Sequence, residues 1–251
     1  GRQIRRVFIP EKEGDLLFAA DYSQIELRIL AHISGDPLLQ DSFLKNQDVH
    51  ARTASEVFDI PLEEVNSAQR RKAKAVNFGI VYGISDFGLS QNLGISRKEA
   101  KNYMDLYFAH YPKVMDYQKE AIRLGKEQGY VKTILGRRRY LPDLHNRNYN
   151  LRSFAERVAM NTPIQGTPAD IIKLAMVKIS AILKEKKLKS KMILQVHDEL
   201  IFNMVPEEKD ILPHIVKEAM EHAMTLHVPL VVDLKVGQDW YHMEKIVNEV
   251  L

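Results

Sequence analysis

The sequence predicts an α+β fold in which a long helical segment is inserted into a sheet domain. Runs rich in apolar and β-branched residues lie near both ends of the chain, at residues 15–21, 191–205 and 229–237, and are typical of strands. Residues 38–124 have helical periodicity almost throughout. No internal repeat or low-complexity linker separates these regions, so we expect one sheet domain that the helical segment interrupts.

The first elements are predicted to be two strands and a helix. "IRRVFIP" (4–10) and "DLLFAAD" (15–21) suit short strands joined by a polar turn. From Ser23 the apolar residues follow a helical spacing, and Ser23 with Glu26 fits the S-x-x-E capping box. We therefore expect a helix to begin directly after the second strand.

The later elements are predicted from caps, breakers and apolar runs. Ser96 and Glu99 fit a second capping box, and Thr167 followed by Pro168 fits the start of another helix. Further predictions are a helix after Pro112, a hairpin around Gly136, a buried hairpin over 191–205, a helix from about Glu207 to His227, and a last strand over 229–237.

Composition excludes several classes of protein. Of the 251 residues, 45% are hydrophobic and 27% are charged, which is ordinary for a globular protein that buries a core. Cysteine is absent, which excludes disulfides and thiolate zinc sites. No apolar run reaches the ~18 residues of a membrane span, so we expect a cytoplasmic protein without a membrane partner. The net charge of +3 is a weak indication of a polyanionic partner.

Carboxylates occupy the ends of two predicted strands. Asp21 closes the strand over 15–21, and Asp198 and Glu199 lie at the tip of the 191–205 hairpin. If these ends meet, the carboxylates repel one another unless a divalent cation such as Mg²⁺ neutralises them. Two such ions ~3.5–4 Å apart suit phosphoryl transfer. Spacing alone leaves a second interpretation open, in which these acids only form turns or caps.

A second informative stretch is "AQRRKAKAVNFGIVYG" (68–83). Arg70, Lys74, Phe78 and Tyr82 are four residues apart, so on a helix they drift by only ~40° per step and share one broad face. Two cations followed by two aromatic rings match the phosphates and base of a nucleoside triphosphate. The alternative is that both rings face the core and both cations are solvated.

Together these stretches resemble the family A DNA polymerases, the bacterial DNA polymerase I type. "DYSQIELR" (21–28), "RRKAKAVNFGIVYG" (70–83) and "QVHDEL" (195–200) resemble its motifs A, B and C in order, and "AMNTPIQGTPADIIK" (159–173) resembles a further stretch. The resemblance covers essentially the whole chain, from Gly1 to about Tyr241.

The resemblance implies an antiparallel palm sheet backed by helices, with an inserted, mostly helical fingers subdomain. The implied palm covers residues 1–28 (motif A) and 153–251 (motif C), and the implied fingers cover 29–152, with the motif B helix at about 67–83. On this resemblance, the 251 residues would lack the family's thumb, proofreading exonuclease, 5′-nuclease and first palm segment.

The resemblance also implies the catalytic residues. Asp21 and Asp198 would bind two Mg²⁺ ions, with Mn²⁺ as a substitute, and the backbone carbonyl of Tyr22 would join them. Glu199 is the neighbouring acid, with a lesser or more variable role. Lys74 would hold the triphosphate and donate a proton to the leaving pyrophosphate.

Further residues would bind the incoming nucleotide. Arg70 and His50 match contacts to the triphosphate, and Gln24 matches a position near the nascent pair. Phe78 would lie against the sugar and base, and Tyr82 near the template base. Glu26 matches the position that blocks a ribose 2′-OH.

The remaining matches concern primer–template DNA. Minor-groove contacts are implied for Arg157, Asn161, Gln165 and His197. Donors there can check pair geometry without reading sequence, because every pair presents N3 or O2 acceptors. Arg137, Arg138 and Arg139 are expected to contact backbone phosphates, with a solvated basic turn as the alternative.

The sequence therefore predicts a monomeric DNA polymerase that transfers deoxynucleotides from dNTPs to a primer 3′-OH on a template. A second interpretation is a truncated core that binds nucleotide or primer–template but is inactive alone. A metal phosphohydrolase has no need of a base-stacking helix, and a single-subunit RNA polymerase disagrees with Glu26.

Overall fold

The computed structural model describes residues 2–246 and divides the chain into two compact units. The first unit contains residues 1–25 and 168–251, and the second contains residues 26–167. The division thus falls close to the predicted subdomain boundary at 28/29, and about fifteen residues after the one predicted at 152/153. The assignment of palm and fingers to these units stays a prediction.

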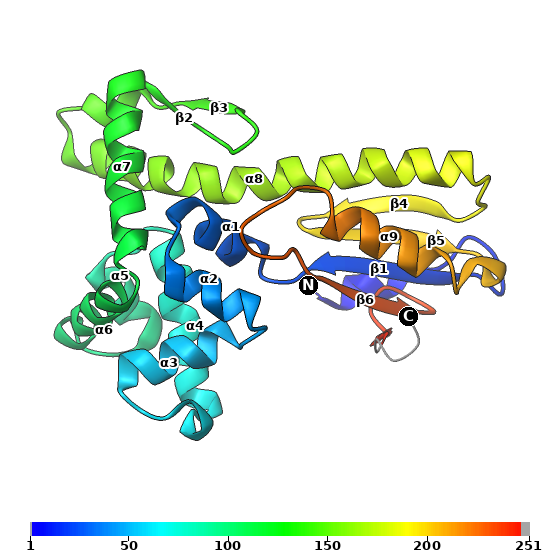
Figure 1. The fold of residues 1–251 in the computed structure, drawn as a ribbon, viewed down its shortest axis with the longest axis horizontal. Coiled ribbons are helices and arrows are strands. Elements are labelled where there is room, and N and C mark those ends of the chain that lie inside the picture. Colours follow the sequence, from blue (N-terminus) through cyan, green and yellow to red (C-terminus); the bar gives the residue numbers. More distant parts are fainter. Residues whose placement is uncertain (1, 247–251) are drawn as a thin grey trace. The chain divides into compact units, whose positions relative to one another are not determined.

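The first unit is built on a five-stranded antiparallel sheet with the order β4-β5-β1-β6-β7 (Figure 1). Its strands are β1 (Leu16–Tyr22), β4 (Lys191–Val196), β5 (Glu199–Met204), β6 (Val232–Gly237) and β7 (Met243–Lys245). The predicted α+β fold with an antiparallel sheet is confirmed. β1 lies at the centre and pairs with β5 on one side and β6 on the other, so it is hydrogen-bonded along both edges.

Both faces of β1 are buried. On one face Phe18 packs against Phe202, and the Tyr22 hydroxyl donates to the Met220 carbonyl (2.7 Å) in α9 (Leu212–Glu221). On the other face Leu17 and Ala19 belong to a cluster with Ile201 and Trp240. The alternation of a strand explains this, because successive side chains point to opposite faces.

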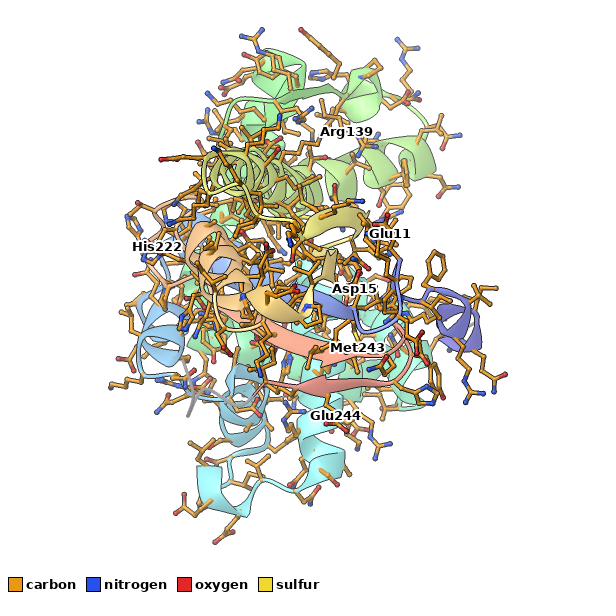
Figure 2. The ribbon with its side chains drawn as sticks, turned by 90° about the vertical axis from the view of Figure 1, so that its right-hand side faces the viewer. Glu11, Asp15, Arg139, His222, Met243 and Glu244 are labelled. Carbon is orange, nitrogen blue, oxygen red and sulfur yellow. The ribbon has the colours of Figure 1, made fainter. Side chains whose placement is uncertain are left out.

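The edges of the sheet are irregular or short. The β4–β5 pairing shifts register between Met192 and Leu194, and the adjacent Ile193 is half exposed. At the other edge β7 has three residues; Met243 and Glu244 are labelled in Figure 2. The sequence analysis did not predict β7, because a strand of three residues is too short to show an alternation of apolar and polar side chains.

The predicted strand over 4–10 is wrong. Residues Arg2–Val7 form the 3₁₀-helix η1. Arg5 lies over the Trp240 ring (4.3 Å) and Arg6 over the Tyr241 ring (4.5 Å), and Phe8 meets Trp240 edge to face. Adjacent residues of a strand point to opposite faces, so a strand would separate two arginines that here stack on neighbouring rings.

The second unit is mostly helical, as predicted. Its helices are α1 (Ile25–Ser34), α2 (Pro37–Leu44), α3 (Val49–Phe58), η2 (Leu62–Glu64), α4 (Ser67–Val81), α5 (Asp86–Leu93), α6 (Arg97–His110), α7 (Pro112–Gln128) and η3 (Pro142–His145), together with the first part of α8 (Tyr149–Glu185). The predicted hairpin around Gly136 is confirmed as β2 (Tyr130–Lys132) and β3 (Arg138–Tyr140). The start of α6 is confirmed, because the Ser96 hydroxyl accepts from the Glu99 N–H.

The Ser23–Glu26 capping box is wrong. α1 begins at Ile25, and Gln24 before it has a left-handed φ of 54°. The Ser23 N–H donates to the Val231 carbonyl (2.8 Å), so tertiary pairing takes the donor that the capping box would use.

The helix predicted to begin at Thr167 is also wrong, because Thr167 lies inside α8, which is continuous from Tyr149 to Glu185. The Thr167 hydroxyl donates to the Pro163 carbonyl (2.6 Å) and accepts from the Ile134 N–H (3.2 Å). A threonine before a proline usually marks a helix start, but here its hydroxyl bonds the preceding turn and the neighbouring hairpin instead.

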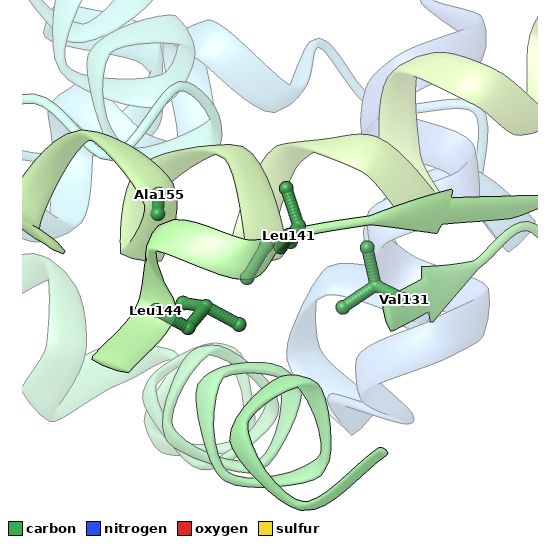
Figure 3. Close-up of a cluster of buried hydrophobic side chains, with 5 residues drawn as sticks. Val131, Leu141, Leu144 and Ala155 are labelled. Atoms are coloured by element: carbon green, nitrogen blue, oxygen red, sulfur yellow. The ribbon is translucent and has the colours of Figure 1, made fainter. Parts of the chain in front are cut away.

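A small core joins this hairpin to α8. It contains Val131 from β2, Leu141 and Leu144 after β3, and Ala155 and Ala159 from α8 (Figure 3).

Within residues 2–246 no helix is both long and apolar enough to cross a membrane.

The remaining two elements of the first unit are η4 (Pro206–Glu208) and α9. They replace the single helix that was predicted from about Glu207 to His227. Pro213 lies in the first turn of α9, where the N–H that proline lacks would have no partner within the helix. This explains why the helix begins at Leu212 rather than near Glu207.

Candidate functional site

The predicted carboxylates lie together at one end of the sheet. Asp21 is paired in register with Glu199 of β5, and the Tyr22 N–H donates to the Asp198 carbonyl (3.2 Å). Asp198 itself lies in the two-residue turn between β4 and β5. The two strand ends that the sequence left unconnected are therefore neighbours. We call Asp21, Tyr22, Asp198 and Glu199 the carboxylate edge.

A fourth acid borders this edge. Asp233 of β6 lies opposite Asp21 on the side away from Glu199, and its carboxylate forms an ion pair with Lys245 (2.6 Å). Residues directly opposite on antiparallel strands share a face, so Glu199, Asp21 and Asp233 form one row across three strands.

The electrostatics of this row disfavour charge. Burial raises the pKa of Asp21, and Asp233 adds to this, while Lys235 and Arg5 oppose it. Burial also raises the pKa of Glu199, with a further contribution from Asp21, although the Trp240 indole donates to its Oε2 (3.2 Å). Carboxylates held in this way gain from a nearby cation.

The donor set suits a hard cation. The carboxylate edge offers only oxygen, which Mg²⁺ prefers. Asp21 is half-buried and Glu199 buried, and acids with raised pKa values favour a positive neighbour. Within the part of the chain that the structure describes, no group of three or more His, Cys, Asp or Glu side chains has the geometry to enclose a metal ion. Water or substrate oxygens would therefore have to complete the coordination, as is usual for Mg²⁺.

The predicted stripe on α4 faces outward. Arg70, Lys74 and Tyr82 are exposed and Phe78 is half-buried, whereas the buried face of α4 holds Ala73, Val76, Asn77, Ile80 and Val81. The alternative in which both rings fill the core is therefore wrong. Phe78 and Tyr82 are stacked at 6.1 Å, and the Lys74 ammonium lies 5.8 Å from the Phe78 ring. We call Arg70, Lys74, Phe78 and Tyr82 the α4 face.

The α4 face borders a cleft of about 720 Å³ in the second unit. The residues that line it include Lys74, Phe78, Tyr82 and Gly83, together with Arg157 of α8. A cleft of this volume is large enough for a nucleotide-sized ligand.

Asp48 forms an ion pair with the first cation of the α4 face. The Arg70 Nε donates to Asp48 Oδ2 (2.6 Å), while Asp48 Oδ1 caps α3 by accepting from the His50 and Ala51 N–H groups. Burial acts to raise the pKa of Asp48, but these hydrogen bonds outweigh it and the pKa is lowered. The pair is largely exposed, so it is worth no more than about 1 kcal/mol.

His50 is buried beside Phe78, with their ring centroids 5.7 Å apart. Its Nδ1 lies 3.0 Å from the Asn77 amide nitrogen. Burial, helped by the nearby Arg70 and Lys74, lowers the pKa of His50 to about 4 against the opposing effect of Asp48. His50 is therefore neutral at pH 7.

Glu26 is tied to the far end of the α4 face. The Tyr82 hydroxyl donates to Glu26 Oε2 (2.7 Å). The carboxylate thus interacts with the α4 face rather than with the start of its own helix. Gln24 precedes α1 in a left-handed conformation.

The predicted minor-groove residues fall into two places. Arg157, Asn161 and Gln165 are spaced by four on α8 and so share one face. The Asn161 amide donates to the Tyr82 carbonyl (3.1 Å), and Arg157 donates to the Ser153 hydroxyl (3.0 Å). His197 is exposed in the β4–β5 turn with a left-handed φ of 54°.

The three consecutive arginines are exposed on and before β3. Arg138 and Arg139 belong to the strand, and Arg137 precedes it. Arg138 stacks on the Tyr130 ring (4.6 Å), which gives it a structural contact within the hairpin. Arg139 is labelled at the surface in Figure 2.

The sequence analysis missed three residues around these sites. Asp233 interrupts an apolar strand, and the alternation of that strand would have assigned it to the face opposite Val232 and Leu234. Asp48 precedes a helical run, which is an N-cap signal. Asn77 gave no usable signal, because its role depends on a histidine 27 positions away.

Comparison with known proteins gives consistent matches over almost the whole chain. The family model described as DNA polymerase family A matches residues 1–242. DNA polymerase I of Bacillus subtilis (strain 168) is 57% identical over 241 residues, covering 96% of this chain and 27% of that protein. DNA polymerase I of Geobacillus stearothermophilus is 54% identical, covering 96% of this chain and 28% of that protein.

A solved structure is also similar. The POL domain of Pol1 from M. smegmatis, in complex with DNA primer-template and dNTP, matches with a TM-score of 0.92 and 44% identity. The match covers 96% of this chain and 42% of that one. The chain spans between 27% and 28% of the length of the curated relatives named above.

Proposed function

Because the chain belongs to DNA polymerase family A, we propose that it catalyses template-directed transfer of deoxynucleotides from dNTPs to a primer 3′-OH, with release of pyrophosphate. The observation that carries the proposal is the carboxylate edge, where Asp21, Tyr22, Asp198 and Glu199 are neighbours. The outward α4 face, with cations at one end and rings at the other, supports a nucleoside triphosphate as substrate.

Family A polymerases are generally metal-dependent, and the carboxylate edge fits that requirement. We assign Asp21, Asp198 and the Tyr22 carbonyl as the ligands of two Mg²⁺ ions, with Mn²⁺ as a substitute, and Glu199 as a neighbouring acid. Bound there, divalent cations would lower the pKa of the primer hydroxyl and neutralise charge on the phosphates. Tyr22 is held in place by its hydroxyl's bond to Met220, and this fixes the backbone beside Asp21.

On the α4 face the proposed roles follow the chemistry of each side chain. Arg70 and Lys74 bind the triphosphate, and Lys74 donates a proton to the leaving pyrophosphate. His50 is neutral and buried beside them, so it acts on phosphate as a hydrogen-bond donor rather than as a charge.

The rings and the acid at the other end select the nucleotide. Phe78 stacks on the sugar and base, with Tyr82 next to the template base. Glu26, held by the Tyr82 hydroxyl, excludes a 2′-OH. Gln24 lies near the nascent pair.

Primer–template DNA is the proposed second substrate. Arg157, Asn161, Gln165 and His197 contact the minor groove, and Arg137, Arg138 and Arg139 contact phosphates. We infer a cytoplasmic monomer with no membrane partner.

A second candidate function follows from the lengths compared above. Because the chain covers little more than a quarter of its relatives, the same residues can bind nucleotide or primer–template and yet turn over negligibly without the rest of the polymerase.

Primer extension with Mg²⁺ and all four dNTPs tests the proposal. We expect extension by the wild type, none by Asp198→Ala, and full activity in Asp210→Ala, which removes an exposed aspartate of the same unit. Chelation of the metal should also stop extension. Failure of folded wild-type protein to extend any primer would refute the catalytic proposal and favour the binding-only function.

A further inference from the structure

Asn77 is a buried polar residue on the side of α4 that packs against α3. It has no solvent exposure and faces α3, where Thr53 is equally buried and His50 is 3% exposed. A buried amide destabilises a protein unless its donors and acceptor are satisfied, so both ends of this side chain need partners.

The two ends of the amide have different partners. The Thr53 hydroxyl donates to Asn77 Oδ1 (3.2 Å). The amide nitrogen, at the other end of the group, lies 3.0 Å from His50 Nδ1. An amide nitrogen can only donate, so Nδ1 must accept and carry no proton.

This arrangement determines the tautomer of His50. In a neutral imidazole one nitrogen accepts and the other carries the proton, so the proton is on Nε2. Protonation of Nδ1 would set two donors against each other and break the bond to Asn77. Arg70 and Lys74 on α4 further disfavour an imidazolium, and Asp48, at the start of α3, acts in the opposite direction.

We propose that Asn77 is a positioning residue that holds His50 as the neutral Nε2–H tautomer, a hydrogen-bond donor to the triphosphate oxygens of the incoming nucleotide. This inference rests on the proposed function for its ligand, although the tautomer itself does not. The Thr53 hydroxyl gives the Asn77 amide its second buried partner. The hydrogen bond from Asn77 keeps His50 a neutral donor across the neutral pH range, so the charge of the ring does not change there.

The first test is the tautomer in the wild-type protein. Long-range ¹H–¹⁵N NMR of histidine-labelled protein distinguishes a protonated from an unprotonated ring nitrogen, and the signals of His50 are identified by their loss in His50→Gln. We expect Nδ1 unprotonated and Nε2 protonated from pH 8 down to pH 5.5. A protonated Nδ1 in this range would overturn the proposal, whatever the protein's activity.

The second test replaces the donor by an acceptor. In Asn77→Asp a carboxylate oxygen faces Nδ1, so we expect Nδ1 to gain a proton, by a change of tautomer at pH 8 and by formation of an imidazolium at low pH. Asn77→Leu, which fills similar volume and offers neither group, should give a mixture of tautomers. A wild-type spectrum in either variant would overturn the role of Asn77.

The binding test uses dATP with Mg²⁺, titrated by calorimetry between pH 5.5 and 8. Relative to wild type, Asn77→Asp should lose affinity by about tenfold at pH 8, where Nε2 becomes an acceptor, and recover it at low pH, where the ring is protonated. A loss of equal size at every pH would indicate a merely structural defect and overturn the inference. If the wild type binds no dATP while its spectrum is as expected, the proposed function fails and the tautomer assignment stands.

Discussion

Acidification should destabilise the protein through His50, in an amount that the structure allows us to estimate. The pKa of His50 falls from 6.5 to about 4 on folding, because burial penalises the imidazolium. The unfolded chain therefore binds more protons between these values, so the free energy of unfolding decreases as the pH falls through this window. At 1.36 kcal/mol per pKa unit, the contribution of His50 is fully present above pH 6.5 and about 3 kcal/mol smaller near pH 4.

Urea denaturation of wild type and His50→Gln across pH 7 to pH 4.5 would measure this term. The variant lacks the titrating ring, so the difference in unfolding free energy between the two proteins should shrink or reverse as the pH falls. His214→Gln, at an exposed histidine of α9, is the matched control and should follow the wild type. A wild-type-minus-variant difference that stays constant within about 0.5 kcal/mol would refute the reasoning, because it would mean that His50 titrates alike in both states.

Three further predictions concern selectivity, packing and a buried carboxylate. Glu26→Ala should raise ribonucleotide incorporation more than it lowers the melting temperature, as measured by single-nucleotide extension with ATP against dATP; unchanged sugar selectivity would contradict the assignment. Gly125→Ala would place a methyl group 2.9 Å from Leu144 Cδ1, and this overpacking opposes the ~1 kcal/mol that alanine gains in a helix. Calorimetry should therefore show a free energy of unfolding lower by about 1–2 kcal/mol, whereas a gain in stability would mean that the cluster is loosely packed. The Glu208 carboxylate accepts hydrogen bonds from backbone N–H groups before β4, including that of Ser190 (2.9 Å). Glu208→Gln should weaken these bonds and lower the free energy of unfolding in denaturant by about 1–2 kcal/mol. An unchanged midpoint would argue against this role.

Local sequence signals were sufficient where one segment determines its own structure. The spacing of Arg70, Lys74, Phe78 and Tyr82 predicted their shared face, since residues four apart on a helix lie almost directly above one another. The apolar run ending at Asp21 predicted a buried strand. The charged tip of the second hairpin placed Asp198 at a turn, whereas Glu199 is the first residue of β5.

Signals failed where a partner distant in sequence decides the outcome. Residues 4–10 suit a strand by composition, but the rings of Trp240 and Tyr241 hold Arg5 and Arg6 in a 3₁₀ turn. Thr167 looks like an N-cap until its hydroxyl is seen to bond within α8 and to the hairpin.

The candidate site shows the same limit. Asp21 and Asp198 were each identifiable, whereas their proximity depends on the pairing of β1 with β5. The row formed with Asp233 requires in addition the register of β6, which no local pattern gives.

The two outer strands of the sheet affect how the protein behaves at high concentration. A regular edge strand presents unpaired N–H and C=O groups to other chains and promotes aggregation. The register shift in β4 disrupts such a template at one edge, and Lys191 at its start adds a charge. At the other edge β7 is three residues long and carries Glu244 and Lys245. Within residues 2–246 neither edge therefore offers a long, regular, uncharged strand, so association of copies through these strands is disfavoured.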